Sequence, residues 1–200
     1  MFGNTLDNEY GFKLDYLNNL GFLSRGKSKH RPRNDPKLLG GPYPLIQTGD
    51  VKQADIYITK YESTYSLFGL QQSKMWPKGT LCITIAANIA ETAILNFDAC
   101  FPDSIVGFIP NDSVNTIFMR FQIEALKDYL NSKATEVAQK NLNIDKLTKV
   151  LLMVPPLELQ NEFASFVELI DKLKFSIRTP VINSNRVNLL APLASNRVIY

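Results

Sequence analysis

The chain has 200 residues, of which 45% are hydrophobic and 20% are charged, and its net charge is +3. These proportions are those of a globular protein with a substantial core, and they exclude a disordered chain and a small scaffold held together by disulfides. Uncharged stretches fall short of the roughly 20 apolar residues of a membrane span, and no secretory pattern opens the sequence, so we expect a cytoplasmic protein.

Residues 1–24 predict a short lead-in element, and positive charge is concentrated directly after it. The segment from Arg25 to Lys37 holds six basic residues and one acid, whereas the rest of the chain carries 16 basic and 18 acidic residues. Its two prolines and its lack of any period predict an exposed loop. Clustered cations bind a polyanion such as DNA by releasing its counterions, and a solvated charged loop is the alternative. The candidate contacts are Arg25, Lys27, Ser28, Lys29, His30, Arg31, Arg33 and Asn34, with the cations facing phosphates and grooves and the others facing phosphates or base edges.

Short runs rich in Ile, Val, Thr and aromatic residues come next, and Gly or Pro separates several of them, which is typical of β-strands. Between these runs, Lys60 and Tyr65 could belong to a recognition loop or to a plain solvent loop, and Asn88 at a turn is a further candidate contact with DNA. We expect Glu91 to be structural and Trp76 to lie in the core. The predicted strands span residues 43–47, 56–59, 80–85, 92–97 and 104–110.

From residue 116 to about 133 the apolar spacing becomes helical, and another β run at 149–154 ends at two prolines. Lys140 and Asn141 lie in the polar stretch between them and are candidates for DNA contact or for helix capping. Interleaved strands and helices without regular alternation predict an α+β domain with a mixed sheet, which we place at residues 1–154 with its DNA-binding loop at 24–37.

The clearest period comes last. After Pro156, six apolar residues are spaced by 4, 3, 4, 3 and 4 positions, as in a heptad seam. This spacing predicts a long helix over 155–178 that pairs with another helix, and an amphipathic helix lying on its own domain is the alternative. Residues 179–200 have no sustained period, so we expect an irregular tail. The seam consists of Leu159, Phe163, Phe166, Ile170, Leu173 and Ile177.

Few residues in this sequence could carry chemistry. There is one histidine, His30, and there are two cysteines, Cys82 and Cys100, whereas metal sites usually need several such ligands at set spacings. A glycine-rich phosphate-binding loop is missing, as is the Asp/Glu-x-Lys triplet that a nuclease would carry after Pro102 and Asp103. We therefore expect no catalytic residue, no metal and no cofactor in this chain, and reduced cysteines packed as small core residues.

Five stretches in this order resemble one half of the DNA-specificity subunit of type I restriction-modification systems, and the resemblance covers residues 2–178. They are residues 24–34 (SRGKSKHRPRN), 40–50 (GGPYPLIQTGD), 76–95 (WPKGTLCITIAANIAETAIL), 138–143 (AQKNLN) and 154–160 (VPPLELQ).

The resemblance implies a target recognition domain that reads one half of a bipartite site in double-stranded DNA, followed by a helix that pairs in an antiparallel coiled coil. It also implies methyltransferase subunits that carry S-adenosylmethionine, and a restriction and translocase subunit reached through the complex, while this chain would be non-catalytic. A full subunit has two recognition domains, so we expect a half-size subunit or a fragment that could act as a homodimer. A coiled-coil adaptor that binds protein without reading DNA is the alternative function.

Overall fold

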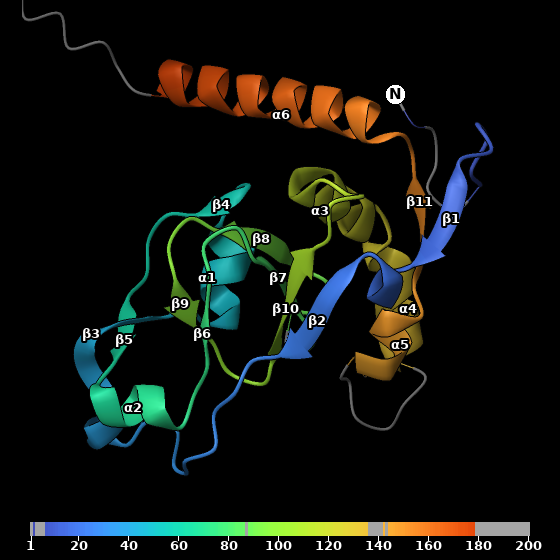
Figure 1. Ribbon diagram of the computed structural model, residues 1–200. Helices are drawn as coiled ribbons and strands as arrows, with labels where there is room; N and C mark the ends of the chain where they lie inside the picture. Colours follow the sequence, from blue (N-terminus) through green and yellow to red (C-terminus); the bar gives the residue numbers. More distant parts are fainter. Residues whose placement is uncertain (1, 3–6, 87, 136–141, 143, 179–200) are drawn as a thin grey trace, which may run out of the picture. The chain divides into compact units, whose positions relative to one another are not determined.

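The computed structural model describes residue 2 and residues 7–86, 88–135, 142 and 144–178 (Figure 1). The chain divides into two compact units, Met1–Phe166 and Val167–Tyr200. The described strands all belong to the first unit, and the last helix begins in the first unit and ends in the second. The predicted tail at 179–200 lies outside the described residues.

The lead-in predicted for residues 1–24 forms two strands. β1 (Lys13–Tyr16) pairs antiparallel with β11 (Leu151–Val154), which places Tyr16 opposite Leu151. A short 3-10 helix, η1 (Leu17–Asn19), then leads into the second strand. Residues from the beginning and the end of the first unit are thereby joined in one two-stranded sheet.

The central sheet has five strands in the order β2-β10-β7-β8-β4. Neighbours run antiparallel except β4 and β8, which are parallel, so the prediction of a mixed sheet is confirmed. β10 lies between β2 and β7, and its first four residues are buried, as expected of a strand covered on both faces. The strands are β2 (Gly21–Arg25), β4 (Tyr57–Ile58), β7 (Leu81–Thr84), β8 (Thr92–Leu95) and β10 (Ile105–Pro110).

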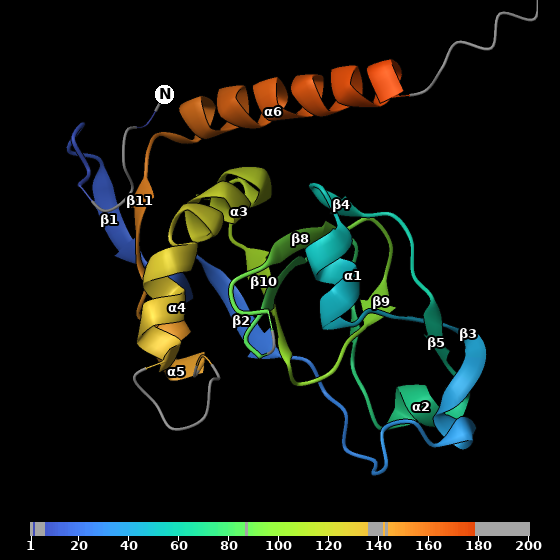
Figure 2. The same ribbon diagram turned by 180° about the vertical axis from the view of Figure 1, so that it is seen from behind.

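A second, four-stranded sheet has the order β5-β3-β9-β6, in which β3 and β9 are parallel. Two short helices, α2 (Leu67–Gln71) and the 3-10 helix η2 (Pro36–Leu38), lie beside β3 and β5 (Figures 1 and 2). The strands are β3 (Leu39–Leu45), β5 (Ser63–Tyr65), β6 (Met75–Trp76) and β9 (Ala99–Cys100).

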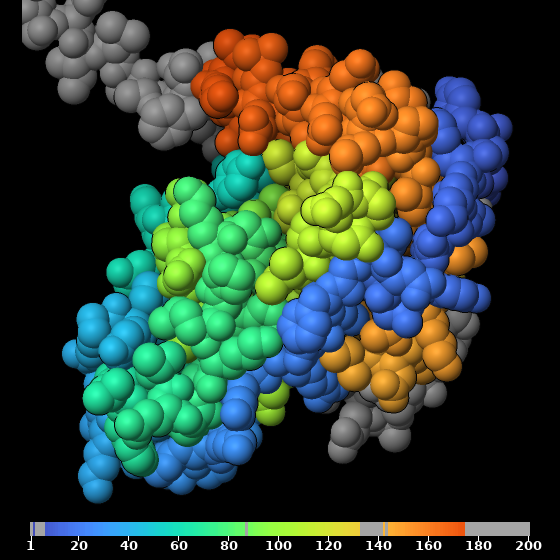
Figure 3. All heavy atoms as spheres, in the orientation of Figure 1, coloured from blue at the N-terminus to red at the C-terminus, as the bar shows by residue number. Residues whose placement is uncertain are grey.

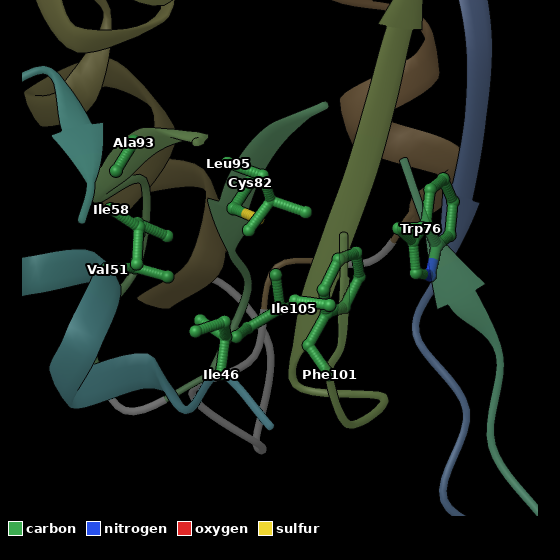
Figure 4. Close-up of a cluster of buried hydrophobic side chains, with 10 residues drawn as sticks. Ile46, Val51, Ile58, Trp76, Cys82, Ala93, Leu95, Phe101 and Ile105 are labelled. Atoms are coloured by element: carbon green, nitrogen blue, oxygen red, sulfur yellow. The ribbon is translucent and has the colours of Figure 1, made fainter. Parts of the chain in front are cut away.

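One cluster of buried side chains joins the two sheets and α1 (Thr48–Gln53), as Figure 4 shows. Trp76 stacks on Phe101 with ring centroids 5.0 Å apart, and a Cβ added to Gly107 would lie 2.6 Å from the tryptophan ring, so only glycine fits there. Trp76 is fully buried, which confirms its predicted place in the core. Cys82 and Cys100 are buried as free thiols, and burial raises the pKa of both.

The helical stretch predicted at 116–133 consists of two helices that separate at Leu126. Asn115 begins the first helix, because its side-chain oxygen accepts hydrogen bonds from two backbone N–H groups of the first turn. The backbone of Leu126, with φ −91° and ψ 6°, is no longer helical. A continuous apolar period could not indicate this break. The two helices are α3 (Thr116–Ala125) and α4 (Lys127–Thr135), and a short helix, α5 (Ile144–Thr148), comes later in the chain.

The helix predicted at 155–178 is α6 (Leu157–Arg178). Within the first unit, the Phe163 ring contacts the rings of Phe2, Phe118 and Phe121 at centroid distances of 5.6, 6.0 and 5.3 Å. Each pair is edge-to-face, an arrangement that adds to the free energy gained by burial. The beginning of the seam therefore packs on its own domain, which was the alternative interpretation of the spacing.

The rest of the seam has a different environment. Phe166 is 57% exposed, and Leu173 is also more than half exposed, whereas Ile170 is partly buried. Leu169, which the heptad spacing did not include, is exposed as well and lies one turn from Phe166 and Leu173. The side chain of Ile177 lies outside the described part of the structure. The prediction that six residues share one seam is corrected: in the first unit Leu159 and Phe163 pack on their own domain while Phe166 is exposed, and in the second unit Leu173 is exposed, as is Leu169.

Candidate nucleic-acid interface

The basic segment is an exposed loop, as its composition predicted. Residues 26–35 form no strand or helix, and the loop joins β2 to η2. Figure 3 shows this loop and α2 side by side on one surface, at the end of the first unit away from α3. The exposed polar and charged side chains of the segment are Arg25, Lys27, Lys29, Arg31, Arg33, Asn34 and Lys37.

The first residues of the loop are fixed to the central core. The N–H of Gly26 donates to the carbonyl of Ile105 at 2.8 Å, and the N–H of Lys27 donates to the carbonyl of Phe101 at 3.0 Å. A Cβ on Gly26 would lie 2.3 Å from the Phe101 carbonyl oxygen, so a larger residue would push the loop away. The direction in which the loop leaves the sheet is therefore set by the backbone.

The residues that follow α2 hold the middle of the loop. Oε1 of Gln72 accepts hydrogen bonds from the N–H groups of Lys29 and His30, at 2.6 and 3.0 Å. The hydroxyl of Ser73 donates to the Lys27 carbonyl at 2.8 Å. These bonds use the backbone of the loop, so the cationic side chains remain free to face outward.

A turn centred on Asp35 closes the loop. The Asp35 carboxylate accepts from the N–H of Lys37 at 3.0 Å and lies 2.8 Å from Nε2 of His30. The hydrogen bond from Lys37 and then the one from His30 hold the pKa of Asp35 below its usual range. The only histidine of the chain thus orders the turn, and its ring also contacts Phe68 edge-to-face at 5.6 Å.

Charge on the loop is only partly neutralised. Asp103, on the segment between β9 and β10, pairs with Arg33 at 2.5 Å and with Arg31 at 3.9 Å. Among the residues that the structure describes, the other cations of the segment have no ion pair with an acid: Arg25, Lys27, Lys29 and Lys37. Four cations on an ordered and exposed loop make a surface suited to phosphates.

Two of the predicted contact residues are not available at this surface. Tyr65 is buried in a cluster with Leu38, Leu45 and Cys100, because β5 pairs with β3 and points this ring inward. Ser28 is buried too, and its backbone carbonyl accepts a hydrogen bond from the guanidinium of Arg31. The predictions that Tyr65 and Ser28 contact DNA are therefore wrong in this conformation.

Lys60 and Asn88 lie on segments of the chain other than the basic loop. Lys60 is exposed between β4 and β5, and Asn88 is half-buried with its side-chain oxygen 3.4 Å from Nζ of Lys52. In the described contacts neither residue forms a hydrogen bond or ion pair with the basic loop. Lys140 and Asn141 lie outside the described residues. Glu91 forms an ion pair with Lys127 at 2.9 Å, which supports its expected structural role.

A further cation lies next to the loop and was not predicted. Nζ of Lys74 lies 3.8 Å from the ring centroid of Trp76 and 4.6 Å from that of the exposed Phe22. Burial lowers the pKa of this lysine. Lys74 directly follows Ser73, whose hydroxyl binds the loop backbone. A single lysine between Ser73 and Met75 gave no signal of this position in the sequence.

In the described residues no helix is both long and apolar enough to cross a membrane. Within the same residues, no group of three or more His, Cys, Asp or Glu side chains could hold a metal ion.

Known proteins share this fold. The HsdS subunit from Thermoanaerobacter tengcongensis superimposes with a TM-score of 0.63 at 17% identity, over 86% of this chain and 41% of that chain. The type I restriction-modification S subunit from M. genitalium gives a TM-score of 0.57 at 12% identity, over 84% and 41%. A chain from a structure describing complex assembly and conformational transition of the type I R-M system gives 0.65 at 18% identity, over 84% and 40%. This chain thus spans less than half the length of the subunits it matches.

At these identities the solved structures establish a common fold. The family model for the type I restriction modification DNA specificity domain matches residues 18–184, which are most of the chain. That match includes the basic loop, both larger sheets and α6. The chain therefore belongs to the family of type I restriction modification DNA specificity domains.

Proposed function

We propose that this chain binds a sequence in double-stranded DNA through the loop at residues 25–37 and directs methyltransferase subunits to it. The observation that carries the proposal is the set of four exposed cations without an acidic partner among the described residues, on a loop fixed at its beginning, middle and end. Phosphate contacts of this kind supply affinity and fix the position of the protein on the duplex. Exposed polar groups such as Asn34 are then able to read base edges.

Assembly is the second part of the proposal. α6 carries exposed apolar side chains, Phe166 in the first unit and Leu169 and Leu173 in the second, on which a second helix or a methyltransferase subunit can pack. The described residues hold one recognition domain, and a homodimer would present a second one, related by twofold symmetry, to the other half-site. The restriction and translocase subunit would join through this complex.

Catalysis belongs to the partners in this proposal. S-adenosylmethionine binds the methyltransferase subunit, and the purified chain alone transfers no methyl group to DNA and cleaves none. A DNA-directed role of this kind places the protein in the cytoplasm.

The test removes charge from the loop. In the variant Lys27→Ala/Lys29→Ala/Arg31→Ala/Arg33→Ala, the slope of log affinity against log salt should flatten by roughly 3.6 if four cations contact phosphates, or by roughly half that if Asp103 keeps both arginines from the DNA. The binding is measured by fluorescence anisotropy on a short duplex over a series of salt concentrations.

The matched control removes four lysines elsewhere, Lys13→Ala/Lys52→Ala/Lys78→Ala/Lys149→Ala, and so makes the same change in net charge from four exposed positions. Its salt slope should stay close to that of the wild type. Equal slopes in the loop variant and the wild type contradict the proposal. The alternative function, a protein adaptor, predicts that the chain binds a methyltransferase subunit and that the complex shows no preference for any DNA sequence.

A further inference from the structure

α2 presents two large apolar side chains to solvent beside the basic loop. Leu67 is 59% exposed and Phe68 is 46% exposed. Apolar residues scattered singly on a surface are common, but two neighbours at the first turn of a helix form a small apolar tip.

The helix cannot turn this tip inward. A Cβ on Gly69 would lie 2.3 Å from the carbonyl oxygen of Leu38 and 2.7 Å from the ring of Tyr65, so the glycine face of α2 is pressed against the domain. Leu70 packs on the same side, against the buried cluster that contains Tyr65. Because residues 69 and 70 face inward, residues 67 and 68 must face outward.

The tip and the cationic loop form one structural element. Ser66, which caps α2 by accepting from the N–H of Gly69, donates its hydroxyl proton to the Lys37 carbonyl at 2.6 Å. At the other end of α2, Gln72 holds the backbone of Lys29 and His30. Loop residues that carry exposed cations are therefore fixed to both ends of the helix that carries Leu67 and Phe68.

We infer that Leu67 and Phe68 are base-reading residues that contact the C5-methyl group of a thymine in the major groove, so that the recognised half-site contains an A·T pair at that position. The inference rests on the proposed function and adds the chemistry of one readout. Duplex DNA supplies both groups that this element lacks, phosphates for the exposed cations and an apolar group for the tip. The thymine methyl is the apolar group that base edges expose there.

The test combines a change in the DNA, thymine to uracil, with a change in the protein, truncation of Leu67 and Phe68. The wild-type chain first selects a duplex from a randomised library, and each thymine of that duplex is then replaced in turn by uracil, which lacks the methyl group. At one position the wild-type affinity should fall about fourfold, the value of one buried methyl. Leu67→Ala/Phe68→Ala should bind the thymine duplex about tenfold more weakly, lose no further affinity on replacement by uracil, and keep the wild-type salt slope.

Leu14→Ala/Leu151→Ala is the matched control, because it truncates two exposed apolar side chains on β1 and β11, and it should keep the thymine preference. Leu67→Ala alone serves as a second variant if the double variant is unstable. If the wild type is selective and the tip variants keep its difference in affinity between the thymine and uracil duplexes, this inference is overturned and the proposed function stands. The same holds if those variants keep that difference in affinity but no longer bind a protein partner. A wild type with no sequence preference overturns both.

Discussion

The basic loop and α6 reach order by opposite means. The loop has no periodic pattern, and hydrogen bonds and ion pairs from residues distant in sequence, such as Gln72 and Asp103, hold it in place. α6 has the strongest period of the chain and forms one continuous helix. Yet the exposure of the loop followed from its composition, whereas the environment of each seam residue in α6 did not follow from its spacing. A charged segment faces water wherever it lies, because burying unpaired charge is costly, while an apolar residue can face any apolar neighbour.

The largest expected effect tests the two faces of α6. Phe163→Ala should lower the free energy of unfolding by about 3 kcal/mol, because the side chain packs among three other phenylalanine rings. Phe166→Ala removes the same atoms from an exposed position and should change that free energy by less than about 0.5 kcal/mol, while weakening association with a methyltransferase subunit. Denaturant unfolding and light scattering measure the two effects. Equal losses of stability would show that the helix does not have two different faces.

The next effect concerns how the loop is held. Gln72→Met keeps the length of the side chain but removes the acceptor used by two loop N–H groups, so DNA affinity should fall by up to about tenfold with the salt slope unchanged. The neighbouring exposed residue on α2 provides the control, Gln71→Met, which should bind DNA as the wild type does. Wild-type affinity in Gln72→Met would mean that the order of the loop is irrelevant to binding.

A smaller effect is expected from Asp103. Asp103→Asn frees Arg31 and Arg33 from their shared carboxylate, so affinity should rise a few-fold at low salt and the salt slope should steepen by up to about 1.8, for two added phosphate contacts. Asp112→Asn makes the same change in net charge at an exposed site outside the loop. If both variants behave alike, Asp103 acts through net charge and not through the two arginines.

The smallest effect is a dependence on pH. The folded pKa of Asp35 is lowered, so its stabilising contribution is present above its unfolded pKa of about 3.9 and is lost as the pH falls through the lowered value. The Lys37 amide should therefore lose protection against exchange, relative to the intrinsic rate at each pH, as the solution is acidified and before the core unfolds. In Asp35→Asn this pH-dependent loss of protection should disappear. Asp15, whose pKa is lowered chiefly by Asn19, should titrate separately, so the readout must be specific to the residue.

Much of the architecture followed from local pattern. Five predicted runs coincide with strands of the two larger sheets, and the helix after Pro156 begins within one residue of that proline. α1 and α2 were not predicted, because six and five residues are too few to show a helical period. Of the candidate site, the exposed cations could be predicted from composition. The residues that orient them could not, since Asp103 lies 70 residues from Arg33 and its partner is chosen only when β9 and β10 fold beside the loop.

By itself, the sequence determined that this chain has a compact mixed-sheet domain, an exposed cationic loop and a long terminal helix. These features depend on average hydrophobicity, charge and period, which act wherever a segment lies. The tertiary structure alone decided that Tyr65 and Ser28 are buried, that Asp103 neutralises two arginines and that Leu67 and Phe68 face outward. Each of these outcomes depends on which atoms of a distant segment occupy the adjacent space, and close packing admits one arrangement.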